Sequence, residues 1–305
     1  MKKLITFIKK ALSILIILFV GFQFIQYINP TFSVDQEFSS IFKTNDYTSE
    51  YIYMLDKDTK EVAYEKNEHK KAYPASLTKI MTALVAIENI DDVFEVAPVD
   101  VKTYQKMVES NAAMAGFYGY EPVTYRDLLY GTILNSGGEA ANSLAINVAG
   151  STEDFVQMMN DKAVELGLED TQFTNPEGLH DKKQFTTAYD MGKLLNYALD
   201  NEYFREIFTK EAFRTTETPD HPDGVLLEST VLSKLDDEMQ DGFKIIGGKS
   251  GTTYEAGQNW ATLGLIEDKE YICIVMGAPL DEVSSPDHAQ ITDTLELFTN
   301  VSMKR

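Results

Sequence analysis

Stretches with the pattern of β-strands stand near both ends of this chain of 305 residues, and helical patterns fill the middle. Tyr51–Leu55 and Glu61–Tyr64 flank the polar turn 56–60 and predict a β-hairpin. The strand pattern returns only late in the chain, in Asn259–Ile266 and Tyr271–Met276. The economical fold is one antiparallel sheet to which both ends of the chain contribute, with a helical insertion between them.

The middle of the chain has the apolar content and spacing of α-helices. Five segments show it: Ile80–Ile87, Tyr125–Leu134, Glu139–Val148, Glu153–Leu166 and Ala188–Leu199. A last helix is expected over Pro286–Thr299. We therefore predict an α/β (α+β) fold, in which an antiparallel β-sheet is flanked by helices and carries a mostly helical subdomain.

The first 28 residues differ from everything that follows. Residues 1–10 carry four lysines and no acidic residue, and Ala11–Ile28 is mostly apolar. This pattern predicts a membrane-targeting segment whose lysines stay in the cytoplasm, so that the rest of the chain is exported. An uncleaved anchor is favoured over a cleaved signal peptide, because no small-x-small cleavage site stands between Phe19 and Pro30. The expected divisions are a cytoplasmic tail 1–10, a transmembrane signal anchor 11–28, a linker 29–45 and a folded extracellular domain 46–305.

Composition excludes several classes of function. The chain has 27 basic and 48 acidic residues, a net charge of −21, and therefore lacks the basic surface that nucleic-acid binding requires. Its single cysteine, Cys273, rules out an internal disulfide and a cysteine-rich zinc site. The four histidines have no metal-ligand spacing. We expect neither a metal nor a cofactor.

The stretch Tyr73–Leu84 carries the clearest chemical signal. Pro74 favours the start of a helix, on which Ser76 and Lys79 stand three residues apart and so share one face. A serine hydroxyl becomes a good nucleophile only when a neighbouring base removes its proton. Lysine can be that base when it is neutral, and burial together with the positive end of the helix favours the neutral form.

With its Pro-Ala-Ser-Leu-Thr-Lys sequence, this stretch resembles the first active-site motif of the low-molecular-mass penicillin-binding proteins, the serine D-alanyl-D-alanine carboxypeptidases. That family shares its fold with class A β-lactamases, and its signature is Ser-x-x-Lys, then Ser-x-Asn, then Lys-Thr-Gly. The second and third motifs correspond here to Ser136-Gly137-Gly138 and Lys249-Ser250-Gly251. The resemblance runs from about Tyr51 to Met276 and includes blocks between the motifs, among them Asn175–Leu179.

The resemblance implies a catalytic role for three side chains. Ser76 would be the acylated nucleophile and Lys79 its proton acceptor. Ser136 would lie between Lys79 and Lys249 and pass a proton toward the leaving D-alanine. The backbone N–H groups of Ser76 and Thr252 would form the oxyanion hole.

The third motif implies the substrate-binding strand, made of Lys249, Ser250, Gly251 and Thr252. Lys249 would add positive charge beside the proton shuttle. Ser250 and Thr252 would bind the terminal carboxylate of the substrate. Ser250 replaces the usual threonine of this motif and keeps its hydroxyl group, so little loss is expected.

A second departure concerns Gly138, which stands where the family carries an asparagine that holds the substrate's amide. Loss of one such contact costs about 1–3 kcal/mol, or roughly 5–150-fold in rate. Asn135, Glu139 or Asn142 are the candidates to compensate, although Glu139 and Asn142 are equally interpretable as structural helix residues.

Three hypotheses follow. The first is a membrane-anchored serine D,D-carboxypeptidase that acts on peptidoglycan stem peptides ending in D-Ala-D-Ala and is covalently inhibited by β-lactam antibiotics. The second is a weakened homologue with a wall-binding or regulatory role. The third is a β-lactamase, which is disfavoured because the nearest candidate for its deacylating glutamate, Glu165, lacks the Glu-x-x-Leu-Asn spacing, so a penicillin adduct is expected to persist.

Overall fold

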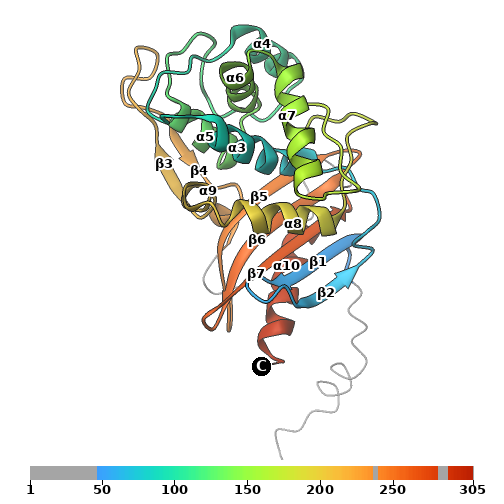
Figure 1. The fold of residues 1–305 in the computed structure, drawn as a ribbon. Helices are drawn as coiled ribbons and strands as arrows, with labels where there is room; N and C mark the ends of the chain where they lie inside the picture. Colours follow the sequence, from blue (N-terminus) through green and yellow to red (C-terminus); the bar gives the residue numbers. More distant parts are fainter. Residues whose placement is uncertain (1–46, 236–239, 281–287, 305) are drawn as a thin grey trace, which may run out of the picture. The chain divides into compact units, whose positions relative to one another are not determined.

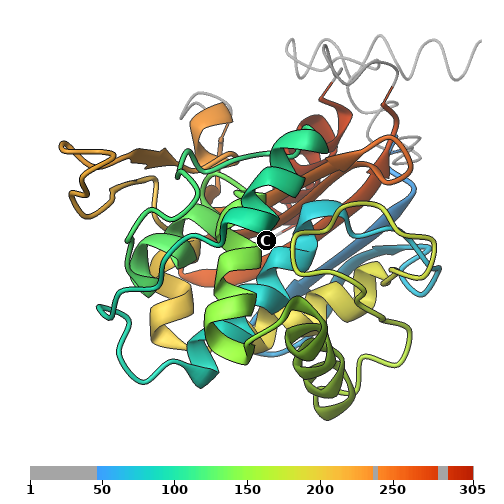
Figure 2. The same ribbon diagram turned by 90° about the horizontal axis from the view of Figure 1, so that it is seen from above.

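Strands from the two ends of the chain lie side by side in one five-stranded antiparallel sheet in the computed structural model, which describes residues 47–235, 240–280 and 288–304 (Figure 1). The strand order is β2-β1-β7-β6-β5. The strands are β1 (Tyr51–Asp56), β2 (Val62–Lys66), β5 (Lys244–Thr253), β6 (Gly257–Ile266) and β7 (Lys269–Ala278). β1 pairs with β7 along its whole length, from Tyr51 opposite Met276 to Asp56 opposite Tyr271. Figure 2 shows the blue strands of the first hairpin beside the orange and red strands.

This pairing confirms the predicted antiparallel sheet and its helical insertion. The residue pattern alone does not reveal β5, because Gly247, Gly248 and Gly251 dilute the β-branched and aromatic pattern by which strands are recognised; only the family resemblance implied a strand at Lys249–Thr252. A second, two-stranded sheet pairs β3 (Ala212–Arg214) with β4 (Leu226–Glu228). Its strands are three residues long, too short for an alternating pattern to be read.

The helices occupy the predicted regions and differ from the predictions mainly at their ends. They are α3 (Thr78–Asn89), α4 (Val101–Glu109), α5 (Tyr125–Ile133), α6 (Gly138–Ala149), α7 (Thr152–Glu165), α8 (Ala188–Ala198), α9 (Glu202–Phe208) and α10 (Ala289–Ser302). The sequence does not predict α4 and α9, which have nine and seven residues and so offer few apolar repeats. The last helix begins at Ala289 rather than at Pro286, which lies outside the described residues.

The central strands β1, β6 and β7 are buried on both faces, which explains why they are largely apolar. On one face, Ile52 and Met54 of β1 join a cluster with Leu297 and Phe298 of α10. On the other face, the neighbouring β1 residues pack in the larger cluster that contains α3 and α8. Figure 1 shows α8 and α10 on opposite faces of the sheet, with the other long helices gathered beyond one end of it.

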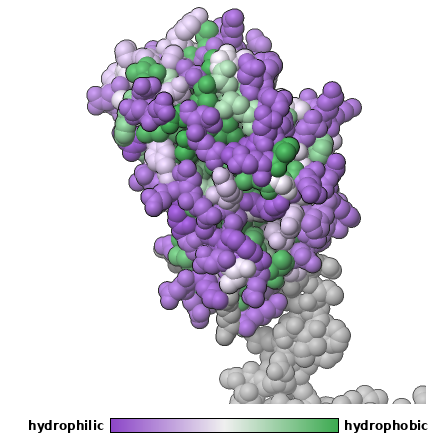
Figure 3. Space-filling view, viewed as in Figure 1, coloured by the Kyte–Doolittle hydropathy of each residue, from purple (hydrophilic) through white to green (hydrophobic). Residues whose placement is uncertain are grey.

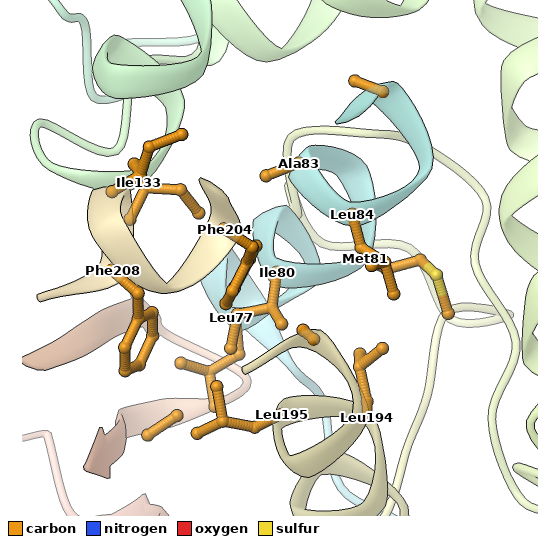
Figure 4. Close-up of a cluster of buried hydrophobic side chains, with 14 of the residues drawn as sticks. Leu77, Ile80, Met81, Ala83, Leu84, Ile133, Leu194, Leu195, Phe204 and Phe208 are labelled. Carbon is orange, nitrogen blue, oxygen red and sulfur yellow. The ribbon is translucent and has the colours of Figure 1, made fainter. Parts of the chain in front are cut away.

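Helix α3 runs through the larger cluster and is fixed there by its apolar side chains (Figure 4). The labelled residues come from η1 and α3, from α5, from α8 and from α9: Leu77, Ile80, Met81, Ala83 and Leu84, then Ile133, then Leu194 and Leu195, then Phe204 and Phe208. Side chains of this size stabilise a fold by about 1.5–3 kcal/mol each when fully buried. The start of α3 is therefore held rigidly against the sheet and its neighbouring helices.

The described face of the molecule in Figure 3 is predominantly hydrophilic, with scattered hydrophobic residues. Within the described ranges, no helix has the length and apolar character needed to cross a membrane. The predicted cytoplasmic tail, transmembrane anchor and linker, residues 1–45, lie outside these ranges.

Candidate active site

Ser76 and Lys79 meet at the point where the short 3-10 helix η1 (Ala75–Leu77) continues into α3. Lys79 Nζ donates a hydrogen bond to Ser76 Oγ over 3.1 Å. Lys79 is only 2% exposed, whereas Ser76 is half-buried and remains accessible. The i, i+3 spacing read from the sequence is therefore a direct contact between a hydroxyl group and a buried amine.

Two glycines allow other segments to approach the backbone N–H of Ser76. A Cβ atom on Gly251 of β5 would lie 2.9 Å from Ser76 N, and one on Gly178 would lie 3.0 Å from the same atom. Gly178 has φ +86°, a conformation that side-chain-bearing residues rarely adopt. Ala75, just before the serine, also has a positive φ of 47°. Strained backbone of this kind is stored preferentially at functional sites.

Burial lowers the pKa of Lys79 to about 8. The carboxylates of Glu177 and Glu139 act in the opposite direction and hold this pKa up. Lys79 Nζ also donates a hydrogen bond to the backbone carbonyl of Glu177. Burial is therefore the main cause of the shift that the sequence analysis attributed to burial and the helix dipole together.

A second lysine–serine pair joins the sheet to the helical layer. Lys249 Nζ on β5 donates to Ser136 Oγ over 2.9 Å and to the carbonyl of Ser250 over 2.7 Å. Ser136 stands between α5 and α6 with a positive φ of 60°. Lys249 is fully buried, and burial together with the nearby positive charge of Lys79 holds its pKa well below the ordinary range.

The remaining residues of the third motif lie on β5, an edge strand of the sheet. Ser250 Oγ lies 2.8 Å from Thr230 Oγ1, and either hydroxyl can be the donor. The Thr252 side chain is exposed and lines a cleft beside Ser76. The structure thus places two hydroxyl groups of this motif along one exposed edge.

A cleft of about 390 Å³ opens beside Ser76. Its lining includes Ser76, Lys79, Gly138, Glu177 and Thr252. Ser136 and Lys249 lie buried at their mutual hydrogen bond. Two larger hollows on the described surface, of about 440 and 700 Å³, contain neither lysine–serine pair, so their size is no guide to the chemistry.

Gly138 lines this cleft at the first residue of α6 and is closely packed on its other side. A Cβ atom there would lie 2.8 Å from Met107 Sδ, and Met107 is fully buried. An asparagine at this position therefore requires Met107 to move. The glycine at position 138, where the family has asparagine, therefore fits the close packing of Met107 around it.

The three residues considered as replacements for that asparagine are all engaged in holding the structure. Asn142 Nδ2 donates to the carbonyl of Gly138 over 2.9 Å and to Glu177 Oε2 over 3.2 Å. Asn135 Oδ1 accepts from the backbone N–H of Glu228 over 2.8 Å. Glu139 Oε1 accepts from three successive backbone N–H groups, those of Ala115, Gly116 and Phe117. Glu139 and Asn142 therefore have the structural role that the sequence analysis had left open.

The structure adds one acidic residue to the site that sequence reasoning missed. Glu177, only 4% exposed, lies in the cleft with Ser76 and Lys79. The glutamate that the sequence singled out, Glu165, instead pairs with Lys162 over 2.8 Å and its side chain is 60% exposed. The signal that could have found Glu177 was its place in the Asn175–Leu179 block, immediately before the glycine that packs against the backbone of Ser76.

Metal-binding and thiol chemistry have no visible site in the described part of the chain. No group of three or more histidine, cysteine, aspartate or glutamate side chains gathers there in a way that would hold a metal ion. Cys273 is buried in β7, and burial raises the pKa of its thiol. A buried, protonated thiol is a packing residue rather than a nucleophile.

An antiparallel sheet with one lysine–serine pair at its edge strand, and a second pair at the start of a buried helix, is the arrangement expected of serine enzymes that use lysine as the base. The chain belongs to the D-alanyl-D-alanine carboxypeptidase family, peptidase family S11, whose model matches residues 39–280.

Known proteins resemble this chain in sequence and in fold. D-alanyl-D-alanine carboxypeptidase DacF of Bacillus subtilis is 36% identical over 152 residues, which are 47% of this chain and 38% of that protein. DacC of Escherichia coli, also a D-alanyl-D-alanine carboxypeptidase, is 32% identical over 240 residues, 75% of this chain and 56% of that protein. The Streptomyces K15 DD-transpeptidase superposes with a TM-score of 0.73 at 25% identity, covering 85% of this chain and 98% of that structure. The chain thus spans less than two thirds of the curated relatives named here, and its fold is confirmed as transpeptidase-like.

Proposed function

We propose that this chain is a serine D,D-carboxypeptidase that removes the terminal D-alanine from peptidoglycan stem peptides. The observation that carries the proposal is the contact of 3.1 Å between Lys79 Nζ and Ser76 Oγ, made by an amine that burial brings to a pKa of about 8. A base with a pKa near the working pH is the most effective proton acceptor for a serine hydroxyl. Membership of the S11 family supports the same reaction.

In the acylation step, Ser76 Oγ attacks the carbonyl carbon between the two D-alanines while its proton passes to Lys79 Nζ. The backbone N–H groups of Ser76 and Thr252 stabilise the negative charge on the carbonyl oxygen. The bond to the leaving D-alanine then breaks, and its nitrogen receives a proton from Ser136, which lies 2.9 Å from Lys249. Ser136 regains a proton from the ammonium group of Lys79, which then equilibrates with solvent before the next step. An acyl group remains on Ser76 and is later hydrolysed.

The edge strand β5 is proposed to bind the substrate. Ser250 and Thr252 would hold the terminal carboxylate through their hydroxyl groups, and the buried Lys249 adds positive charge behind them. Gly251 keeps β5 close to Ser76, because any side chain there would collide with the nucleophile's backbone. β-Lactam antibiotics are proposed to acylate Ser76 in the same cleft.

One observation favours a second candidate, a catalytically weakened homologue with a wall-binding or regulatory role. Gly138 presents no side chain to the cleft, and Asn135, Glu139 and Asn142 are bonded elsewhere. A substrate amide would then lose one hydrogen bond, at a cost of about 1–3 kcal/mol. The two lysine–serine pairs are complete, so the carboxypeptidase remains the leading function.

We also propose that residues 11–28 anchor the protein in the cell membrane as a single pass, with the catalytic domain 46–305 outside. The four lysines before an apolar run support this orientation. Membrane fractionation with N-terminal sequencing of the mature protein tests it. Recovery of a soluble form that lacks residues 1–28 would contradict the anchor and show that this segment is a cleaved signal peptide.

The activity is tested with the full-length chain in detergent, incubated with a fluorescent penicillin and with a stem peptide ending in D-Ala-D-Ala. We expect mass spectrometry to place the adduct on Ser76 and free D-alanine to be released. The Ser76→Ala variant, with a melting temperature equal to that of the native protein, should form no adduct and release no D-alanine. A folded native protein that is not labelled and releases no D-alanine would favour the binding-protein candidate.

A further inference from the structure

Glu177 lines both the cleft beside Ser76 and a second hollow of about 280 Å³, and one oxygen of its carboxylate is hydrogen-bonded while the other is not. Its Oε2 atom accepts a hydrogen bond from Asn142 Nδ2 over 3.2 Å. Its Oε1 atom has no hydrogen-bond partner among the described residues. Buried carboxylate oxygens are normally bonded to protein or to water, so an Oε1 atom without a protein partner, on a residue that lines the cleft, is a candidate site for a water molecule.

The backbone that carries Glu177 is fixed against the nucleophile and its base. The Glu177 carbonyl accepts from Lys79 Nζ, and the preceding carbonyl, of Pro176, accepts from Thr82 Oγ1 over 2.7 Å. The following residue, Gly178, packs so closely on Ser76 N that a Cβ atom would lie only 3.0 Å away. A side chain attached between these contacts has little freedom to leave the cleft.

The electrostatics agree with this placement. Glu177 is the largest of the charged influences that hold the pKa of Lys79 up against burial. The carboxylate therefore acts on the catalytic amine through space as well as through the backbone. The cleft contains two candidate proton acceptors beside Ser76, an amine and a carboxylate, on different segments of the chain.

We propose that Glu177 is the general base for deacylation, taking a proton from the water that hydrolyses the acyl group on Ser76. This inference rests on the proposed carboxypeptidase function and specifies its second half-reaction. It assigns acylation to Lys79 and the activation of water to Glu177. The proposed role is catalytic, because the carboxylate contacts the attacking water.

The water oxygen bonds to the acyl carbon, and one water proton passes to Glu177 Oε1. The bond between the acyl carbon and Ser76 Oγ then breaks, and Oγ takes a proton from the ammonium group of Lys79. Transfer of the proton on Glu177 to the neutral Lys79 restores both groups, and the net change is the addition of one water molecule.

Separate bases for the two half-reactions suit the charge of Lys79. With a pKa of about 8, this lysine is largely protonated at neutral pH. An ammonium group cannot accept a proton from water, but it can donate one to the departing Ser76 Oγ. A carboxylate in the same cleft supplies the missing acceptor.

The test compares the full-length native protein with Glu177→Gln, Glu177→Asp and the matched control Glu165→Gln. The label from a fluorescent penicillin is followed as it forms, and then as it is lost after free penicillin is removed. We expect Glu177→Gln to lengthen the half-life of the label at least about 100-fold, because a general base contributes 10²–10⁴-fold. Its acylation rate should change less than about tenfold.

The Gln variant keeps an oxygen for Asn142 Nδ2, and the Asp variant keeps a displaced carboxylate, for which an intermediate half-life is expected. Glu165→Gln should match the native protein in both phases. Loss of label from Glu177→Gln at the native rate would overturn the proposal, as would a change confined to acylation, which would mean that Glu177 only adjusts Lys79. If Glu177→Gln does not fold, a native half-life in Glu177→Asp overturns it instead.

The two proposals fail in different ways. Absence of any label on folded native protein would overturn the proposed function and this inference together. Normal labelling of Ser76 with no effect of Glu177 on label loss would overturn this inference alone. In a supporting result, mass spectrometry of Glu177→Gln with the stem peptide shows the acyl group accumulating on Ser76.

Discussion

Lys249 Nζ lies 2.9 Å from Ser136 Oγ, although the two residues stand 113 positions apart in the chain. Their contact joins the edge strand of the sheet to the turn that begins α6. Lys79 and Ser76 form the corresponding pair within a single helical turn. The site therefore combines one local pair and one long-range pair, and both lysines are buried with lowered pKa values.

The pH dependence of acylation should follow Lys79. Its pKa of about 8 lies below the ordinary lysine value because of burial. In the proposed reaction the neutral amine is the form that accepts the proton of Ser76. The acylation rate should therefore rise with pH through about 8, by about tenfold between pH 7 and pH 9. Penicillin labelling under subsaturating conditions measures this rate.

Lys79→Arg is the control for that profile, because arginine stays protonated at these pH values. In this variant Ser76 should not be labelled by penicillin at pH 7 or at pH 9. A native profile that is flat across this range would show that the titration of Lys79 does not limit acylation.

Lys249→Met should separate activity from stability. The substitution removes a fully buried amine that donates to Ser136 Oγ and leaves an apolar chain of similar length. Acylation should fall by about 100-fold or more, because the proton path through Ser136 loses its partner. The free energy of unfolding should stay the same or rise, since burying an ammonium group is unfavourable.

Urea unfolding and penicillin labelling of the same sample measure both effects of Lys249→Met. A loss of stability that accompanies the loss of activity would contradict the expectation. It would mean that Lys249 holds Ser136 and β5 together as well as serving the reaction.

Gly178→Ala and Gly150→Ala form a matched pair of substitutions in left-handed backbone. Their φ angles are +86° and +83°, but a Cβ atom at Gly178 would collide with the backbone of Ala75 and Ser76, whereas one at Gly150 meets nothing within 4 Å. Gly150→Ala should cost about 1–2 kcal/mol of unfolding free energy, from strain alone. Gly178→Ala should cost about 2–5 kcal/mol, because overpacking adds to the strain.

Chemical denaturation measures the unfolding free energies of the two glycine variants, and penicillin labelling measures their acylation rates. Of these two variants only Gly178→Ala should slow acylation, because Gly178 packs against the backbone of Ser76 and Gly150 does not. Equal losses of unfolding free energy in the two variants would show that the loop around Gly178 relaxes without disturbing Ser76.

Gly138→Asn tests the departure from the family's second motif. The new Cβ atom would lie 2.8 Å from Met107 Sδ, so the single variant should lose about 1–3 kcal/mol of stability. With Met107→Ala in the same chain, the asparagine has room, and the combined cost should be less than the sum of the two single costs. D-alanine release by the double variant should exceed the native rate by about 5–150-fold.

Thermal melting and D-alanine release of all four chains, native, two single variants and the double variant, complete this cycle. If the stability losses of the two single variants add up to the loss of the double variant, Met107 and position 138 do not interact. An unchanged rate in a stable double variant would mean that the cleft does not need an amide side chain at position 138.

The sequence was a good guide to elements whose pattern is long and regular. Strand β1 of the first hairpin and the late strands β6 and β7 are apolar along most of their length, because helices cover both faces of this part of the sheet. The strand β5 was hidden by its glycines, although those glycines are what let it approach Ser76. Local patterns reveal burial, whereas close backbone packing removes the side chains on which such patterns depend.

By itself, the sequence determined the ordered serine and lysine motifs, and the spacing of Ser76 and Lys79 fixed their contact, because three residues make nearly one helical turn. Only the tertiary structure decided that Ser136 meets Lys249, that Asn142 and Glu139 are bonded to backbone and to Glu177, and that Glu177 rather than Glu165 enters the cleft. These contacts join segments far apart in the chain, and their positions depend on how the sheet and helices pack, which no local spacing records.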